Sequence, residues 1–72
     1  MLIYAVQDKE GHILDYFTKY SFAMSSIQLS CQKLTVKFIA TIVNSSITEV
    51  YLDDSKAFII QRVEVKDRSD HL

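Results

Sequence analysis

Glycine, proline and cysteine are almost missing from this 72-residue chain, which has one glycine, one cysteine and no proline. With only Gly11, the chain has no glycine-rich loop of the kind that binds phosphates or dinucleotides. With only Cys31, it has neither a disulfide framework nor a cysteine-rich metal site. These absences exclude nucleotide-binding motifs and disulfide scaffolds, and they favour a reducing, cytoplasmic setting.

An excess of one charge and long apolar runs are missing as well. Eight Lys and Arg residues face nine Asp and Glu residues, for a formal net charge of −1. Such a chain has no overall electrostatic attraction for phosphate. No apolar run reaches the roughly 18–20 residues that span a bilayer, so we expect no membrane partner. We expect one cytoplasmic domain over residues 1–72.

Hydrophobic residues, by contrast, make up 49% of the chain. This fraction is too high for a disordered tail. A folded domain of this size buries only about 60% of the surface that its unfolded chain exposes, which makes a lone monomer marginal. We therefore expect self-association, most simply as a homodimer.

Alternating apolar residues and turn signals predict five strands, over residues 2–7, 13–18, 33–43, 47–52 and 56–65. Gly11 supplies a positive φ for the turn between the first two strands. Asp53 and Asp54 form the turn before the last strand. The continuous apolar run 58–60 is typical of a strand covered on both faces, and we expect a second chain to cover it.

The segment 18–32 fits two patterns. Met24, Ile27 and Cys31 follow one another at helical spacing, whereas Ile27, Leu29 and Cys31 alternate with polar residues as in a strand. A short helix and an irregular excursion both remain open here. The predicted fold is mainly β, a small five-stranded antiparallel sheet or barrel, with this helix as a possible insertion.

No set of side chains predicts catalysis or metal binding. His12 and His71 lie in a turn and a tail without a third ligand at metal spacing. Asp53 and Asp54 are interpreted as turn residues, and Cys31 as a small core residue, because no neighbouring base would activate its thiol. We expect no enzymatic activity, no metal and no cofactor.

The residues from 52 to 65, Leu-Asp-Asp-Ser-Lys-Ala-Phe-Ile-Ile-Gln-Arg-Val-Glu-Val, carry a resemblance. They resemble the closing segment of the CsrA/RsmA family of translational regulators, with identities at Asp53, Lys56, Arg62 and Glu64. Residues 34–39 resemble the third strand of that family, and residues 1–4 its opening. The residues between 14 and 34 resemble the insertion after the second strand in the RsmN-like branch.

The resemblance implies a CsrA-like domain that forms an interlocked homodimer. In that dimer the first strand of one subunit pairs beside the last strand of the other, and two symmetric sites bind GGA-containing RNA hairpins. The implied RNA-binding residues are Arg62, Gln61, Ile60, Phe58 and Tyr4. The implied dimer-interface residues are Leu2, Ile3, Tyr4, Ile59 and Val63.

Three functions stay open at this point. The chain is a post-transcriptional regulator that binds mRNA or small RNA, with Arg62 as its main contact. Alternatively, it has lost RNA binding and modulates an RNA-binding CsrA-family relative by protein contact. The net charge and the loss of the family's basic residue around Ala5 and Val6 favour that second function. The third alternative is an unrelated small β-rich inhibitor or interaction protein.

Overall fold

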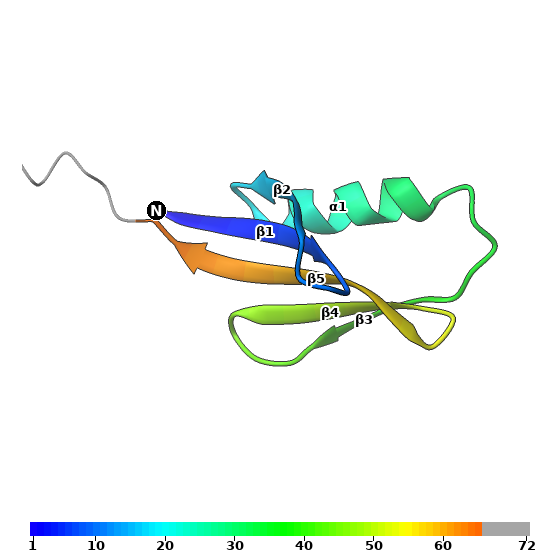
Figure 1. Cartoon of the computed structure of the whole chain (residues 1–72). Helices are drawn as coiled ribbons and strands as arrows, with labels where there is room; N and C mark the ends of the chain where they lie inside the picture. Colours follow the sequence, from blue (N-terminus) through cyan, green and yellow to red (C-terminus); the bar gives the residue numbers. More distant parts are fainter. Residues whose placement is uncertain (66–72) are drawn as a thin grey trace, which may run out of the picture.

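The computed structural model describes residues 1–65 of the chain. In chain order its elements are β1 (Leu2–Asp8), β2 (Ile13–Phe17), α1 (Tyr20–Cys31), β3 (Phe38–Ile42), β4 (Ile47–Leu52) and β5 (Ser55–Glu64) (Figure 1). The five strands form one antiparallel sheet in the order β2-β1-β5-β4-β3. This confirms the predicted five-stranded, mainly β fold. The sheet is open, because β2 and β3 each pair on one side only.

The ambiguous segment after the second strand forms the inserted helix. Ala23 and Ile27, four residues apart, are buried on the face of α1 that packs on the sheet. The helix exposes serines on its outer side, and the Ser30 hydroxyl donates to the Ser26 carbonyl oxygen at 3.0 Å. Leu29, which a strand would have placed with Ile27, is 67% exposed. Helical spacing therefore prevails over the alternating pattern.

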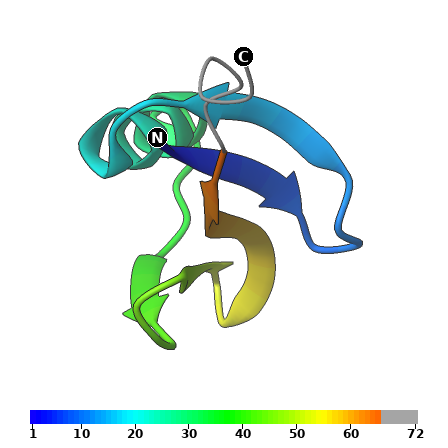
Figure 2. The ribbon, with the colours of Figure 1, turned by 90° about the vertical axis from the view of Figure 1, so that its left-hand side faces the viewer.

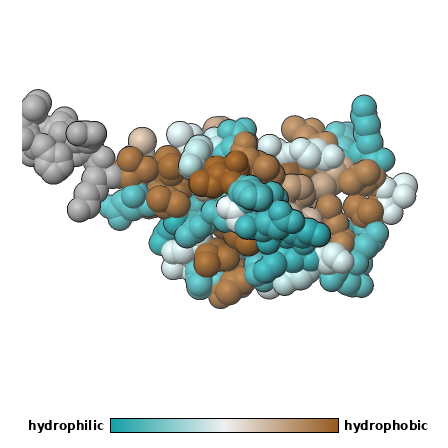
Figure 3. All heavy atoms as spheres, in the orientation of Figure 1, coloured by the Kyte–Doolittle hydropathy of each residue, from teal (hydrophilic) through white to brown (hydrophobic). Residues whose placement is uncertain are grey.

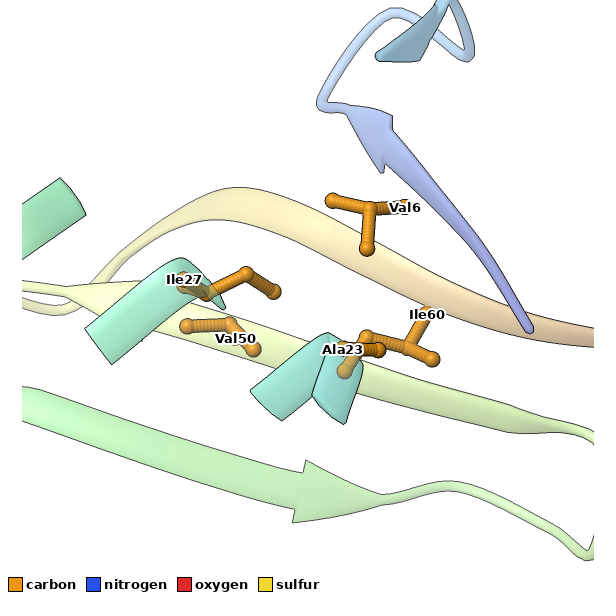
Figure 4. Packing of buried hydrophobic residues seen from close by; sticks show 5 residues of the cluster. All are labelled: Val6, Ala23, Ile27, Val50 and Ile60. Atoms are coloured by element: carbon orange, nitrogen blue, oxygen red, sulfur yellow. The ribbon is translucent and has the colours of Figure 1, made fainter. Parts of the chain in front are cut away.

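The sheet curls, and α1 lies against its inner face (Figure 2). The buried core consists of residues from β1, α1, β4 and β5, namely Val6, Ala23, Ile27, Val50 and Ile60 (Figure 4). Val6 and Ile60 are cross-strand partners. Because α1 packs mainly on β1 and β2, it covers only part of the inner face.

The third strand begins later than its alternating pattern predicts. It starts at Phe38, and Leu34 is exposed in the connection from α1. The Leu34 N–H donates to the Cys31 carbonyl oxygen, which continues the helix end by a turn. Lys37 and Asp53 then exchange two hydrogen bonds of 2.9 Å, which fix the start of β3 beside the end of β4.

The first and last strands pair within one chain. The register runs without interruption from Leu2 opposite Glu64 to Asp8 opposite Phe58. The pairing that the resemblance assigns to two interlocked subunits therefore needs no second subunit here. The apolar run in β5 has an internal explanation as well, because Ile60 and Phe58 face the core while Ile59 lies half-buried on the other face.

Both predicted turns are confirmed by their backbone conformations. Gly11, between β1 and β2, has a φ of 90°. Asp53 and Asp54, between β4 and β5, have φ values of 51° and 67°. Aspartate tolerates this left-handed region better than most residues, so the acidic pair serves the tight turn.

We expect Ile60→Ala to lower the free energy of unfolding by about 2–5 kcal/mol, because it leaves a cavity in the core. The Ile60 side chain is only 1% exposed. Leu29→Ala, a truncation at a site that is 67% exposed, should change the free energy by less than about 0.5 kcal/mol. Urea unfolding followed by circular dichroism measures both. Equal effects of the two substitutions would contradict the described core.

Candidate functional site

Two of the residues predicted to bind RNA meet on the sheet. Tyr4 and Arg62 are cross-strand partners on β1 and β5, so their side chains share one face. The Tyr4 ring packs edge-on against the Tyr20 ring, with centroids 5.9 Å apart. The Tyr20 hydroxyl in turn donates to Thr48 Oγ1 at 3.1 Å. A fixed aromatic ring thus stands beside the exposed guanidinium, and we call this pair the Tyr4–Arg62 surface.

The other three predicted RNA contacts do not join this surface. Ile60 is buried in the core, and Phe58 packs against the core from the same strand. Gln61 points to the opposite face, where its Oε1 accepts a hydrogen bond from Gln7 Nε2 at 2.9 Å. The backbone of β5 is paired by β1 on one side and β4 on the other, so it offers no free edge to a ligand.

The predicted dimer-interface residues divide between the two faces of the sheet. Ile3 opposes Val63 across the β1–β5 ladder, and Ile59 lies two register positions beyond Gln61 on the same face. These three are half-buried on the face opposite α1. Leu2 and Tyr4 lie on the α1 side. The structure therefore gathers only part of this set.

Lys56, one of the identities in the resemblance, is engaged by a carboxylate. Its Nζ lies 3.3 Å from Glu49 Oε2, and the Tyr51 hydroxyl donates to Glu49 Oε1 at 3.0 Å. The hydrogen bond from Tyr51 and then that from Lys56 hold the pKa of Glu49 below its ordinary value. Donation to Glu49 raises the pKa of Tyr51. This cluster neutralises a cation that phosphate would otherwise attract.

The Asp8 carboxylate organises the β1–β2 turn. Its Oδ1 accepts the backbone N–H groups of Glu10 and His12, both at 2.9 Å, and its Oδ2 lies 3.1 Å from His12 Nδ1. The His12 backbone N–H is the main cause that lowers the pKa of Asp8. The sequence-based prediction that His12 has no third ligand near it is wrong, because ligand atoms of Asp8, Glu10 and His12 lie within 4.8 Å of one another. The Asp8 carboxylate among them is engaged by the hydrogen bonds of the turn. His12 is exposed, as predicted, and His71 lies outside the described residues.

A further apolar surface lies on β2 and was not singled out from the sequence. Ile13, Leu14 and Tyr16 are each about half exposed, and no strand within residues 1–65 pairs with the outer side of β2. We call these three residues the β2 edge surface. Figure 3 shows that hydrophobic side chains reach the exterior at several places between hydrophilic ones. Four large apolar or aromatic residues in a five-residue hairpin arm, of which only Phe17 packs against the core, are the sequence signal for such a surface.

Comparison of the chain with protein-family models, with curated proteins and with solved structures finds no match. The resemblance to the CsrA/RsmA regulators thus remains a prediction from the quoted residues. In the part of the chain that the structure describes, no helix has the length and apolar character needed to cross a membrane.

We expect Asp8→Ala to lower the free energy of unfolding at neutral pH, because the turn loses the acceptor of its backbone N–H groups. The folded chain lowers the pKa of Asp8. The stabilisation is therefore present above the unfolded pKa of about 3.9 and disappears as the pH falls through the folded value. The difference between wild type and variant should shrink below about pH 4. Urea unfolding across this pH range measures it.

His12→Ala is the matched control, because it keeps both backbone donors to Asp8 and removes only the ring. Its effect should be smaller than that of Asp8→Ala. A difference between wild type and Asp8→Ala that persists unchanged at low pH would show that the carboxylate charge is irrelevant to the turn.

Proposed function

We propose that this chain is a small non-enzymatic protein that acts by binding another protein through the β2 edge surface. One observation carries the proposal: β2 leaves one side unpaired and exposes Ile13, Leu14 and Tyr16 there. Large apolar groups on a nearly neutral surface favour contact with protein over contact with a polyanion.

The binding mode that we propose for β2 is addition of a partner strand to the regular part of the ladder, Asp15 to Phe17, beyond the register shift near Gln7. The outer backbone N–H and C=O groups of an edge strand can pair with an extended segment of a partner. On β2 the Tyr16 N–H donates to Asp15 Oδ1 at 2.8 Å, so this hydrogen bond has to break when a partner strand pairs there. The half-exposed side chains of Leu14 and Tyr16 then supply the apolar anchors. Asp15 is the only charged residue in β2, so little charge must be desolvated on binding.

This proposal covers two of the three functions left open by the sequence. A CsrA-like chain that modulates an RNA-binding relative and an unrelated small inhibitor both act by protein contact. The paired backbone of β5 and the occupied Lys56 support protein contact over RNA binding. An RNA-binding protein of the CsrA family is the first partner to test.

Leu14→Lys should weaken binding of the partner by about 30-fold, which corresponds to the loss of a hot spot of about 2 kcal/mol. Leu29→Lys is the matched control, because it places the same charge on an exposed leucine of α1. Titration with a purified CsrA-family protein, and quantitative recovery of proteins bound to the tagged chain in its native cells, measure both variants. Equal partner recovery with both variants, or binding in neither assay, would refute the proposal.

RNA binding through the Tyr4–Arg62 surface is the second candidate function. The observation that favours it is an exposed guanidinium beside an aromatic ring, without an ion-pair partner among residues 1–65. The forked donors of arginine suit phosphates and base edges, and the part of the half-buried Tyr4 ring that reaches the surface can stack on an unpaired base.

For this candidate we expect a GGA-loop RNA hairpin to bind the wild type and to bind Arg62→Ala at least tenfold more weakly, about 1.4 kcal/mol. Lys33→Ala removes a cation of equal charge from the loop before β3 and should leave affinity nearly unchanged. A fluorescence titration across a salt series measures affinity and the number of phosphate contacts. Absence of binding, or equal weakening by both variants, would exclude this site.

A further inference from the structure

We propose that the free edge of β3 is a self-association surface, on which the β3 strand of a second copy of this chain adds antiparallel. Two five-stranded sheets would then become one continuous sheet. This surface is separate from the β2 edge surface, so the two proposals stand or fall independently.

The β3 edge lacks the features that normally prevent strand addition. Its residues, Phe38-Ile39-Ala40-Thr41-Ile42, include no charge and no proline. Its ladder with β4 runs without a register shift. Natural edge strands are usually protected by lysine, proline or a bulge, and an uncharged flat edge is a template for another strand.

Two backbone hydrogen bonds establish which groups of β3 face outward. The Val43 N–H donates to the Ile47 carbonyl oxygen at 3.0 Å, and the Lys37 carbonyl oxygen accepts from the Asp53 N–H at 2.9 Å. Both residues therefore direct their backbone groups toward β4. Along an antiparallel strand, successive residues direct their backbone N–H and C=O groups to opposite sides. The even-numbered residues between Lys37 and Val43 therefore direct these groups toward the open edge. These outward residues are Phe38, Ala40 and Ile42.

A two-fold axis through Ala40 would place the outward backbone groups of one β3 strand opposite those of the β3 strand of a second copy. Ala40 then opposes its own copy, and Phe38 opposes Ile42 of the second chain, which gives about six backbone hydrogen bonds. Phe38 and Ile42 form an aromatic and β-branched cross-strand pair at each end. Lys37 comes to lie opposite Val43, so the two lysines are at opposite ends and no like charges meet.

The side chains on β3 support the same partner. Ile42 opposes the buried Thr48, which places it on the inner face of the sheet, yet it is 71% exposed. It is exposed because α1 packs mainly on β1 and β2, at the other end of the sheet. Burial of Ile42 against Phe38 of a second copy removes this apolar area from water.

The β2 edge is less suited to a second copy. Asp15 is its central residue, so two-fold pairing centred there would bring two carboxylates together. Its ladder with β1 also contains a register shift between Val6 and Gln7. Because β3 has no charged residue and its ladder with β4 has no register shift, we assign self-association to β3 and not to β2.

Sedimentation equilibrium over a range of concentrations tests the proposal. The wild type should form a dimer of 8.3 kDa chains. Ile42→Lys, and Ala40→Pro, which replaces an outward N–H, should each weaken dimerisation at least tenfold. Proline is tolerated on an edge strand where the N–H faces solvent, so its ladder with β4 is kept. Leu29→Lys, the matched control on α1, should dimerise like the wild type.

Amide hydrogen exchange on the unmodified chain provides a measurement that does not depend on a variant folding. The amides of Phe38, Ala40 and Ile42 should become protected as concentration rises, while Ile39 and Thr41 are already protected through β4. A wild type that stays monomeric at every concentration would overturn the proposal. A dimer in which the three outward amides still exchange rapidly would overturn it as well, because its interface would lie elsewhere.

Discussion

The pairing of β1 with β5 inside one chain determines the arrangement of the other elements. It joins residues 50 to 62 positions apart, and the backbone contact between Met1 and Val65 extends the ladder past its last pair. With β5 held between β1 and β4, the strands next to them in sequence, β2 and β3, become the two edges. Such a non-local contact has a large loop-closure cost, so the fold forms only because the central ladder and the core favour the same arrangement.

The placement of α1 explains why apolar side chains of β3 stay exposed on the inner face, whereas Tyr16 of β2 is exposed on the face opposite α1. One helix of twelve residues covers part of the inner face, and it packs on β1 and β2 more than on β3. Ala23 allows α1 to approach the sheet closely, and Ile27 fills the space above Val50 (Figure 4). Beyond the helix, Ile42 remains on the inner face without a cover. The placement of α1 over β1 and β2 thus leaves the apolar side chain of Ile42 available for the proposed contact with a second copy.

The sequence predicts local structure well where the hydrophobic periodicity fits a single element and a turn residue marks the same boundary. The β4 strand is predicted with its observed bounds, because its alternating residues end at the Asp53-Asp54 turn. The start of β3 is misjudged because Leu34 and Val36 continue the alternation through a connection whose path is set by the distant Asp53. The helix remains ambiguous from the sequence because Ile27 and Cys31 belong to both patterns, and burial of Ala23 together with exposure of Leu29 decides between them.

The candidate site depends on long-range pairing, which periodicity does not encode. Alternation alone places Gln61 and Arg62 on opposite faces of β5, so these two could have been separated from the sequence. The adjacency of Tyr4 and Arg62 could not, because it depends on the register between the first and last strands. Burial of Ile60 likewise depends on the placement of α1.

The two edges of the sheet differ in charge, and this difference separates their proposed roles. The carboxylate of Asp15 in β2 disfavours pairing with the β2 strand of a second copy, because two carboxylates would meet. It is compatible with a partner whose segment is neutral or basic. The uncharged β3 meets no such penalty with its own copy. Because β2 and β3 lie at opposite ends of the strand order, a dimer through β3 leaves both β2 edges accessible. Such a dimer would present two equivalent binding edges, and a partner with two copies of its own segment would bind it with higher avidity than a monomer.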